Sequence, residues 1–455
     1  MLISSYLSHM HNKSGGDMLN KQHLAWGAAL LLAIPGVSTA TNGYFTHGYG
    51  TASKALAGGG IALPQDSLAA ATNPAGMVWV GDSMDLGASL FSPNREYTGG
   101  SAFGGGLFPI MPGNHDSDNT LFLIPSFGWN TMLDQNSSMG VSVYANGGMN
   151  TEYANDPYVW GPARGVFADG TTGVDLKQLF VNLSYARKIN ERASWGASLI
   201  LAAQAFEAKG LSNFAGFTNH FVTTGTAATN LSDNGHDISY GAGLKFGIQG
   251  EVADGLTLAA SYQTKTWMSE FDDYKDLFAD NGDFDIPATA TIGLAWKPNQ
   301  RHAFTFDIQR IWYSDIDAVS NPMSNLFTCG PATPENCLGG DNGAGFGWDD
   351  MTVFKLGWQY QPNDLWTIRA GYSHTNHPIN DEDIVFNILA PAVMEDHFTF
   401  GLTRKIGKDQ AINFAAMYAP KVSLDGSNPF TGGPAQSVEI EMYQYELELS
   451  YSWKF

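Results

Sequence analysis

The last thirteen residues of the chain, 443–455, alternate strictly between apolar and polar side chains. An alternation with a period of two is the signature of a β-strand that has one apolar and one polar face. Leu447 and Leu449 in the middle are flanked on both sides by aromatic residues of the same face. A short aliphatic band between two aromatic belts is typical of a strand whose outer face meets lipid. The pattern therefore predicts a transmembrane β-strand.

The composition fits a barrel built from such strands. Charged residues make up only 15% of the 455 residues, compared with roughly 25% in an average soluble domain, while aromatic residues reach 13% and there are 52 glycines. The net charge of −21 argues against a nucleic-acid partner, because phosphate binding needs a basic surface. It fits loops that meet divalent cations at an anionic membrane surface, and equally an acidic surface that only keeps the protein soluble.

An apolar run of 11 residues, 24–34, follows Lys21 and precedes Ser38-Thr39-Ala40. A basic residue, a short apolar stretch and a small-x-small site make a secretory signal peptide, which is too short to cross a membrane as a helix. Residues 1–40 are therefore expected to be removed, and a start at Met18 would give a signal of conventional length. No later run of about 18 apolar residues occurs, so no transmembrane helix is expected in the exported chain.

Segments of alternating hydrophobicity recur from Ser83 to the end of the chain. Their connections are alternately short and long, as in outer-membrane barrels with tight periplasmic turns and long external loops. Fourteen strands are expected, near residues 84–97, 120–131, 137–149, 174–188, 194–209, 237–250, 256–270, 286–297, 302–315, 350–361, 365–376, 393–405, 410–422 and 437–455.

The alternative fold is a soluble sandwich or propeller, in which the apolar face of each strand lies in a core. The polar face would then meet water and be rich in Lys and Glu, whereas here it carries mainly Thr, Ser, Gly, Asn and Gln. Such a face suits an enclosed lumen. We therefore predict an all-β protein, in which residues 83–455 form a 14-stranded antiparallel transmembrane β-barrel.

Residues 41–82 differ from the rest of the exported chain. Small residues, glycine runs and two short Ala-rich stretches predict compact turns and brief helices, in a segment too small to fold alone. Fourteen strands enclose a lumen that is wider than side chains can fill. Residues 41–82 are therefore the candidate plug.

Cys329 and Cys337 lie eight residues apart in a loop rich in Gly and Pro. In an exported protein this spacing favours a local disulfide. A metal site is not expected, because no His or further Cys lies nearby, and no cofactor is expected.

Asn73-Pro74-Ala75 stands just before the first strand, residues 146–153 read NGGMNTEY, and the C-terminal third contains GWDD (347–350), RAGY (369–372) and NILAP (387–391). These passages resemble the FadL/TodX family of outer-membrane transporters of long-chain fatty acids and hydrophobic compounds. With the strand pattern, the resemblance covers the whole exported chain. It implies a fourteen-stranded barrel plugged by a small N-terminal hatch. The terminal Phe455 is also similar to the last residue of bacterial outer-membrane barrels, which addresses the chain to the barrel assembly machinery.

The resemblance assigns roles to two groups of residues. The hatch would include Asn42, Tyr44, Phe45, Asn73, Pro74 and Ala75, and a kinked third strand would open the wall sideways at Asn146, Gly147 and Gly148. Consecutive glycines in a strand promote a bulge. An ordinary bend at the end of a strand would explain Gly147 and Gly148 as well.

Two external loops carry apolar residues that are candidates for a capture groove: Leu211, Phe214, Phe217, Phe221, Leu277 and Phe278. Exposed apolar residues suggest a binding surface, although the same residues could equally pack the loops together. The cations with inward parity are candidates for binding a carboxylate headgroup: Lys245, Lys355 and Arg369. The alternative is that they pair with acidic lumen residues such as Asp307 or Glu446.

The predicted function is passive uptake of long-chain fatty acids or similar hydrophobic compounds across the outer membrane of a Gram-negative bacterium. A monomer in outer-membrane lipid would capture the ligand externally, hold it in a lumenal pocket, rearrange its hatch and release the ligand sideways. A transporter of aromatic hydrocarbons with the same fold is the alternative. An enzyme barrel using Ser373, His374 and His377, a polar porin and an adhesin remain as further alternatives, and the N-terminal plug argues against the enzyme and the porin.

Overall fold

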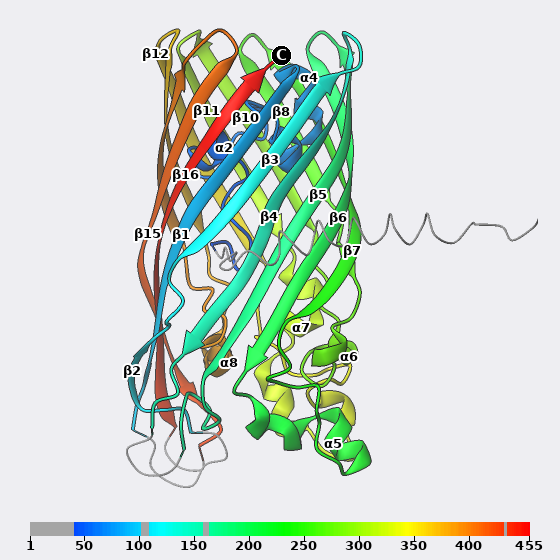
Figure 1. Cartoon of the computed structure of the whole chain (residues 1–455), viewed down its shortest axis with the longest axis vertical. Coiled ribbons are helices and arrows are strands. Elements are labelled where there is room, and N and C mark those ends of the chain that lie inside the picture. Colours follow the sequence, from blue (N-terminus) through cyan, green and yellow to red (C-terminus); the bar gives the residue numbers. More distant parts are fainter. Residues whose placement is uncertain (1–40, 102–108, 158–162, 432–434) are drawn as a thin grey trace, which may run out of the picture.

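The computed structural model describes residues 41–101, 109–157, 163–431 and 435–455, so the predicted signal peptide lies outside the described residues. In these ranges, sixteen strands form one antiparallel sheet that closes into a barrel (Figure 1). Two strands are short: β2 (Gly113–Asp116) pairs with β1, and β9 (Trp267–Met268) pairs with β7. The other fourteen make the wall: β1 (Ser83–Gly99), β3 (Phe122–Met132), β4 (Ser137–Tyr153), β5 (Thr172–Asn190), β6 (Ala193–Lys209), β7 (Asp237–Ala253), β8 (Leu256–Gln263), β10 (Thr289–Asn299), β11 (His302–Ile311), β12 (Met351–Asn363), β13 (Trp366–Thr375), β14 (Asp396–Lys405), β15 (Gln410–Asn428) and β16 (Gln436–Lys454). The predicted 14-stranded antiparallel barrel is confirmed.

The first and last strands close the barrel. β16 pairs with β1 without a register shift along the whole of β1, from Ser83–Lys454 to Gly99–Val438. On its other side, β16 pairs with β15. The alternating residues at the end of the chain therefore lie in the strand that closes the sheet. Closure removes the open sheet edges, whose unpaired backbone groups a bilayer does not tolerate.

The two faces of the wall have the reverse polarity of a soluble protein. On β16, Leu449 is 59% exposed on the outside, whereas the adjacent Glu448 is 2% exposed because it faces the lumen. Large apolar side chains are exposed on the outer face of the other strands as well, among them Leu90, Leu199, Leu244, Ile292, Leu356 and Phe400. An apolar exterior around a polar interior is the arrangement expected for a barrel in lipid.

The predicted strand positions differ from the structure mainly at the end of the barrel that carries the long loops. The strand predicted at 256–270 ends at Gln263, and the strand predicted at 302–315 ends at Ile311, where the chain turns into a short helix. The strand predicted at 410–422 continues to Asn428, because β16 accompanies it past a register shift between Ala419 and Val422. The outward residues of that extension are polar, so the hydrophobic pattern does not mark it.

Short helices lie in two places, inside the barrel and at the long-loop end (Figure 1). Those inside are α2 (Thr51–Lys54), α3 (Ala69–Thr72), the 3₁₀-helix η1 (Pro74–Gly76) and α4 (Met77–Val80). Those of the loops are η2 (Ser212–Phe217), α5 (Asn219–Thr224), η3 (Asp272–Tyr274), α6 (Ala279–Gly282), η4 (Tyr313–Asp315), α7 (Asp317–Ser320), η5 (Met323–Thr328), η6 (Pro334–Asn336), η7 (Asp381–Asp383) and α8 (Ile384–Asn387). Within the described ranges, no helix has both the length and the apolar character needed to cross a membrane.

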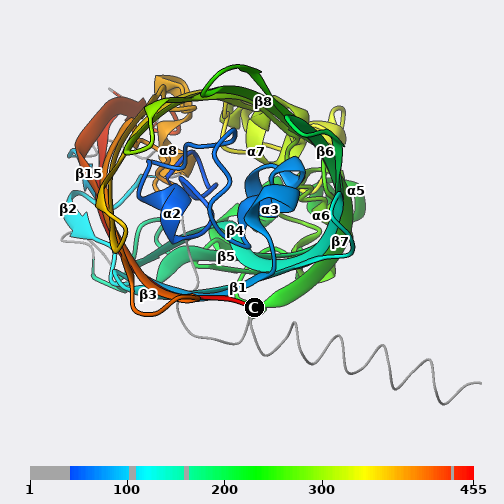
Figure 2. The same ribbon diagram turned by 90° about the horizontal axis from the view of Figure 1, so that it is seen from above.

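Residues 41–82 lie inside the ring of strands (Figure 2). Inward-facing glycines let the backbone of this segment touch the wall directly. A Cβ atom on Gly196 of β6 would lie 2.5 Å from the carbonyl carbon of Pro74, and one on Gly371 of β13 would lie 2.3 Å from that of Leu56. The wall is therefore shaped to receive this segment.

The outward orientation of Leu449 generates a test of the fold. Replacing Leu449 by Arg should lower the free energy of unfolding in lipid vesicles on the order of 2–4 kcal/mol, because the charge must enter the lipid face of the barrel. Leu449→Phe keeps this face apolar and is the control. Denaturant unfolding in vesicles measures both variants, and equal stability of the two would contradict the outward assignment.

Candidate functional site

The Asn73-Pro74-Ala75 motif ends the lumenal segment in a capped helix. The side chain of Asn73 accepts a hydrogen bond from the backbone N–H of Ala75 (3.0 Å), and Pro74 occupies the first position of η1. Asparagine as an N-cap and proline at the first position both favour the start of a helix. Ser194 of β6 donates a hydrogen bond to the carbonyl oxygen of Ala75 at 2.7 Å. The motif thereby attaches the end of residues 41–82 to the wall.

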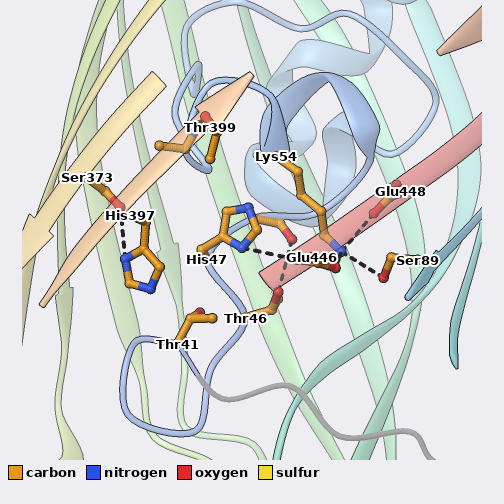
Figure 3. A network of polar contacts seen from close by, with 12 residues as sticks. Thr41, Thr46, His47, Lys54, Ser89, Ser373, His397, Thr399, Glu446 and Glu448 are labelled. Carbon is orange, nitrogen blue, oxygen red and sulfur yellow. Dashed lines mark hydrogen bonds and ion pairs between the residues drawn. The ribbon is translucent and has the colours of Figure 1, made fainter. Parts of the chain in front are cut away.

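Lys54, Glu446 and Glu448 form an ion-pair cluster in the lumen, which we call the anchoring cluster (Figure 3). The ammonium group of Lys54 lies 2.5 Å from a carboxylate oxygen of Glu446 and 2.7 Å from one of Glu448. Burial alone would lower the pKa of Lys54, but the two carboxylates outweigh burial and raise it. Thr51 also donates a hydrogen bond to Glu448 at 2.7 Å. The cluster therefore holds α2 against β16.

His47 lies beside the anchoring cluster and stacks on His397 of β14, with ring centroids 6.1 Å apart (Figure 3). Its Nδ1 atom is 3.4 Å from a carboxylate oxygen of Glu446. Burial, together with the positive charges of Lys54 and Lys355, holds the pKa of His47 well below its usual value. The ring is therefore neutral at neutral pH, and its contact with Glu446 is not an ion pair.

Two of the three residues of the alternative enzyme site, Ser373 and His374, lie on opposite faces of the wall. Ser373 faces the lumen with its Oγ 3.3 Å from Nδ1 of His397, whereas the exposed His374 contacts Asp396 at 2.9 Å. Successive residues of a strand point to opposite faces of the sheet, so Ser373 and His374 cannot share a site.

Among the described residues, no group of three or more His, Cys, Asp or Glu side chains could hold a metal ion.

The three cations predicted to bind a headgroup all contact the lumenal segment. Lys355 donates to the carbonyl oxygens of His47 (3.2 Å) and Gly58 (3.4 Å), and Lys245 donates to that of Ala71. Arg369 donates to the side chain of Gln65 at 2.6 Å.

The acidic partners proposed as the alternative are also engaged with residues 41–82. Asp307 accepts hydrogen bonds from the backbone N–H groups of Gly60 (2.7 Å) and Ile61 (2.9 Å), and Glu446 pairs with Lys54. Inward-facing cations and carboxylates of the wall thus hold the same segment.

The wall is split between β3 and β4. These strands pair only between Phe127–Val143 and Met132–Ser138, while the pairing of β4 with β5 continues to Tyr153. The pairing of β4 with β5 shifts between Ala145 and Gly147, at the position predicted to kink. The predicted opening residues 146–148 therefore lie where β4 has separated from β3.

The start of the lumenal segment pairs with this edge of β4. Thr46 donates its backbone N–H to the carbonyl oxygen of Asn146 (3.1 Å), and Gly148 donates to that of Tyr44 (2.8 Å). A Cβ atom on Gly147 would lie 1.9 Å from the carbonyl oxygen of Tyr44. Only glycine at this position leaves room for the backbone of residues 44–46, which takes the place of a neighbouring strand.

Aromatic residues from the loops surround Tyr44. Its ring centroid lies 5.1 Å from that of Tyr313, 5.9 Å from Trp348 and 6.0 Å from Phe284. The hydroxyl of Tyr313 donates to the carbonyl oxygen of Asn42 at 2.6 Å and accepts the N–H of Tyr44 at 3.1 Å. The start of the lumenal segment is thus connected to the loops as well as to β4.

An apolar cavity lies among the loops at the long-loop end of the barrel and is partly open to solvent. No charged or polar side chain of the described residues lines it. The lining residues are Phe167, Val174, Phe206, Leu211, Phe214, Leu231, Leu277, Phe278, Ala318, Leu338, Ala344, Gly345, Phe346, Phe386 and Leu389. The side chains that line this cavity therefore offer a ligand apolar contacts and no hydrogen-bonding or charged group.

Four of the six residues predicted for the capture groove line this cavity: Leu211, Phe214, Leu277 and Phe278. Phe217 instead packs beside the apolar core, and Phe221 is 39% exposed on α5. Phe346, Phe386 and Leu389 also line the cavity, although the sequence pattern did not predict a role in capture for them. The nearby GWDD and NILAP motifs indicated only the family resemblance and not a cavity.

Cys329 and Cys337 form the predicted disulfide, in the loop that also supplies Leu338 to the cavity.

The same fold occurs in solved outer-membrane transporters. The P. putida toluene transporter TodX has a TM-score of 0.63 and 18% identity, covering 90% of this chain and 99% of that chain. A Pseudomonas aeruginosa FadL homologue has a TM-score of 0.65 and 17% identity, covering 91% and 100%. The Ralstonia pickettii toluene transporter TbuX has a TM-score of 0.60 and 17% identity, covering 90% and 99%. At these identities the similarity shows the fold alone.

No curated protein matches the sequence. Residues 38–441 match the family described as outer membrane protein transport protein (OMPP1/FadL/TodX), which is most of the chain. The polarity of the closed barrel agrees with an outer-membrane channel. The chain therefore belongs to the OMPP1/FadL/TodX family of outer-membrane channels for hydrophobic compounds.

Proposed function

We propose that this channel takes up uncharged hydrocarbons by passive transport and releases them sideways into the membrane between β3 and β4. The main support for this proposal is the apolar cavity at the long-loop end, which the described residues line with apolar side chains alone. Outer-membrane barrels have long external loops, so this cavity would face the medium from which a ligand arrives. Two solved relatives of the same fold, TodX and TbuX, are toluene transporters.

The chemistry of the cavity favours a hydrocarbon over the fatty acid predicted first from the sequence. Moving a carboxylate out of water is costly unless a cation or hydrogen-bond donors receive it. The candidate cations Lys245, Lys355 and Arg369 bond to residues 41–82 and do not line the cavity. A hydrocarbon needs no such partner, and each buried CH₂ group contributes about 0.8 kcal/mol.

A series of aromatic side chains leads from the cavity to the split in the wall. Phe278 of the cavity lining lies 4.9 Å from Phe284, and Phe284 lies 6.0 Å from Tyr44, measured between ring centroids. Tyr44 in turn lies 5.4 Å from Phe45, whose backbone pairs with Gly147. These rings would allow an apolar ligand to move inward without passing the charged groups of the lumen.

Release would require residues 44–46 to leave the edge of β4. Two backbone hydrogen bonds join these segments, and a typical hydrogen bond contributes a net of about 0.5–1.5 kcal/mol. Separating them costs far less than unfolding the wall. The segment pairs with β4 from inside the barrel, so its displacement would open the split while β1, β3, β4 and β5 keep their other pairs.

A lysine placed in the cavity distinguishes a hydrocarbon site from a fatty-acid site. Leu277→Lys should weaken the binding of toluene at least about tenfold, which corresponds to about 1.4 kcal/mol, because the ammonium group or its water would occupy the apolar space. Leu277→Met keeps the cavity apolar and is the control. Equilibrium binding to the detergent-purified protein measures both, with a long-chain fatty acid as second ligand.

The wild-type protein should bind toluene more tightly than Leu277→Lys does, whereas the fatty acid should bind more tightly to Leu277→Lys than to the wild-type protein. If the wild-type protein bound the fatty acid and ignored toluene, the proposed ligand class would be wrong.

The role of residues 44–46 in release can be tested by deleting residues 42–50. The barrel should still fold, since its wall pairs with itself. Hydrocarbon uptake by cells should fall to a small fraction of the wild-type rate, because Tyr44 and Phe45, the last rings of the aromatic series that leads to the split, would be missing. Gly147→Val tests the same contact by a single change, because its side chain would displace Tyr44 and fill the split. Gly216→Val is the control, as a Cβ atom there has no neighbour within 4 Å. Uptake that is unchanged in both the deletion and Gly147→Val would rule out this release route.

A further inference from the structure

The disulfide between Cys329 and Cys337 stands next to the segment that joins the loops around the cavity. Cys337 is fully buried, and it is followed by Leu338, which lines the cavity. We call residues 337–340 the junction segment. The chain contains no other cysteine, so this is the one covalent link that a reductant would break.

One side of the junction segment pairs with the loop that follows β6. Leu338 donates its N–H to the carbonyl oxygen of Phe217 (3.0 Å), and Asn219 donates its N–H to the carbonyl oxygen of Leu338 (2.8 Å). The side chain of Asn219 also donates to the carbonyl oxygen of Pro334 within the disulfide-closed loop (3.0 Å). The loop paired in this way supplies Leu211 and Phe214 to the cavity.

The other side of the junction segment pairs with the loop that precedes β10. Asn281 donates its N–H to the carbonyl oxygen of Gly339 (3.2 Å), and Asp280 donates to that of Gly340 (3.3 Å). Gly339 has a φ of +79°, and a Cβ atom there would lie 2.6 Å from the carbonyl oxygen of Lys275. This second loop supplies Leu277 and Phe278 to the cavity.

We propose that the Cys329–Cys337 disulfide positions three walls of the capture cavity through the junction segment, so that ligand affinity depends on its oxidation. The disulfide restrains residue 337, the first residue of the junction segment, which lies between the two other loops and is bonded to both. Loops with few restraints must be ordered when a ligand binds, and this ordering lowers affinity. The inference rests on the proposed function, because it assumes that the cavity is where the hydrocarbon binds.

The experiment measures equilibrium binding of naphthalene to the full-length protein, purified in detergent, before and after reduction with a phosphine. Reduction should weaken binding about fivefold or more, since several cavity side chains would have to be ordered again by the ligand. The denaturant midpoint of the barrel and its heat-modifiable migration on gels should not change. A loss of affinity with an intact barrel separates positioning of the cavity from general stability.

A second variant acts on the junction with the disulfide intact. Asn219→Pro removes the N–H that bonds to Leu338, at the first position of α5, where proline is tolerated. Thr218 before it has φ −94° and ψ 151°, which suits the residue preceding a proline. Asn219→Ala keeps this N–H and is the matched control. Naphthalene should bind more weakly to Asn219→Pro than to Asn219→Ala.

The outcomes distinguish the two proposals. Binding by the oxidised protein that is unchanged both by reduction and in Asn219→Pro would overturn the role of the disulfide and leave the proposed function standing. No binding of naphthalene or toluene by the oxidised protein would overturn both. Weaker binding on reduction, accompanied by an equal fall in the denaturant midpoint of the barrel, would also count against a role confined to the cavity.

Discussion

The backbone pairing of β1 with β16 is the interaction on which the rest of this structure depends. It extends along the whole of β1 and turns an open sheet into a closed wall. In lipid, an open edge would leave backbone groups without partners, at a cost of several kcal/mol for each group. Closure also reverses the usual polarity of the chain, because leucines such as Leu449 face outward and carboxylates such as Glu448 face inward.

A closed wall of this size creates a second problem, which is the contents of its lumen. Residues 41–82 are too few to form a core of their own, and they lie inside the barrel among polar side chains. Buried charges are tolerated when they are paired and hydrogen-bonded. Lys54 with Glu446 and Glu448, and Asp307 with the N–H groups of Gly60 and Ile61, meet that condition.

The split between β3 and β4 interrupts the pairing of the wall at the point where the lumenal segment begins. Residues 44–46 pair with the freed edge of β4, so the backbone groups of Asn146 and Gly148 keep partners. Satisfying an edge with a short, separable segment is a way to combine a tight wall with a removable seal. The apolar cavity and the aromatic residues around Tyr44 approach that seal from the long-loop end.

The sequence by itself determined the barrel, its fourteen strands and which face of each strand meets lipid. It could do so because the period of two is a local property of consecutive residues. The polar extension of β15 escaped detection, since beyond Ala419 its outward face no longer carries the apolar signal. The cavity and the seal were decided only in the tertiary structure. Lys54 meets Glu446, which is 392 residues away, and Phe217 meets Leu338 across separate loops. Such contacts depend on how the closed wall brings distant segments together, which no local pattern encodes.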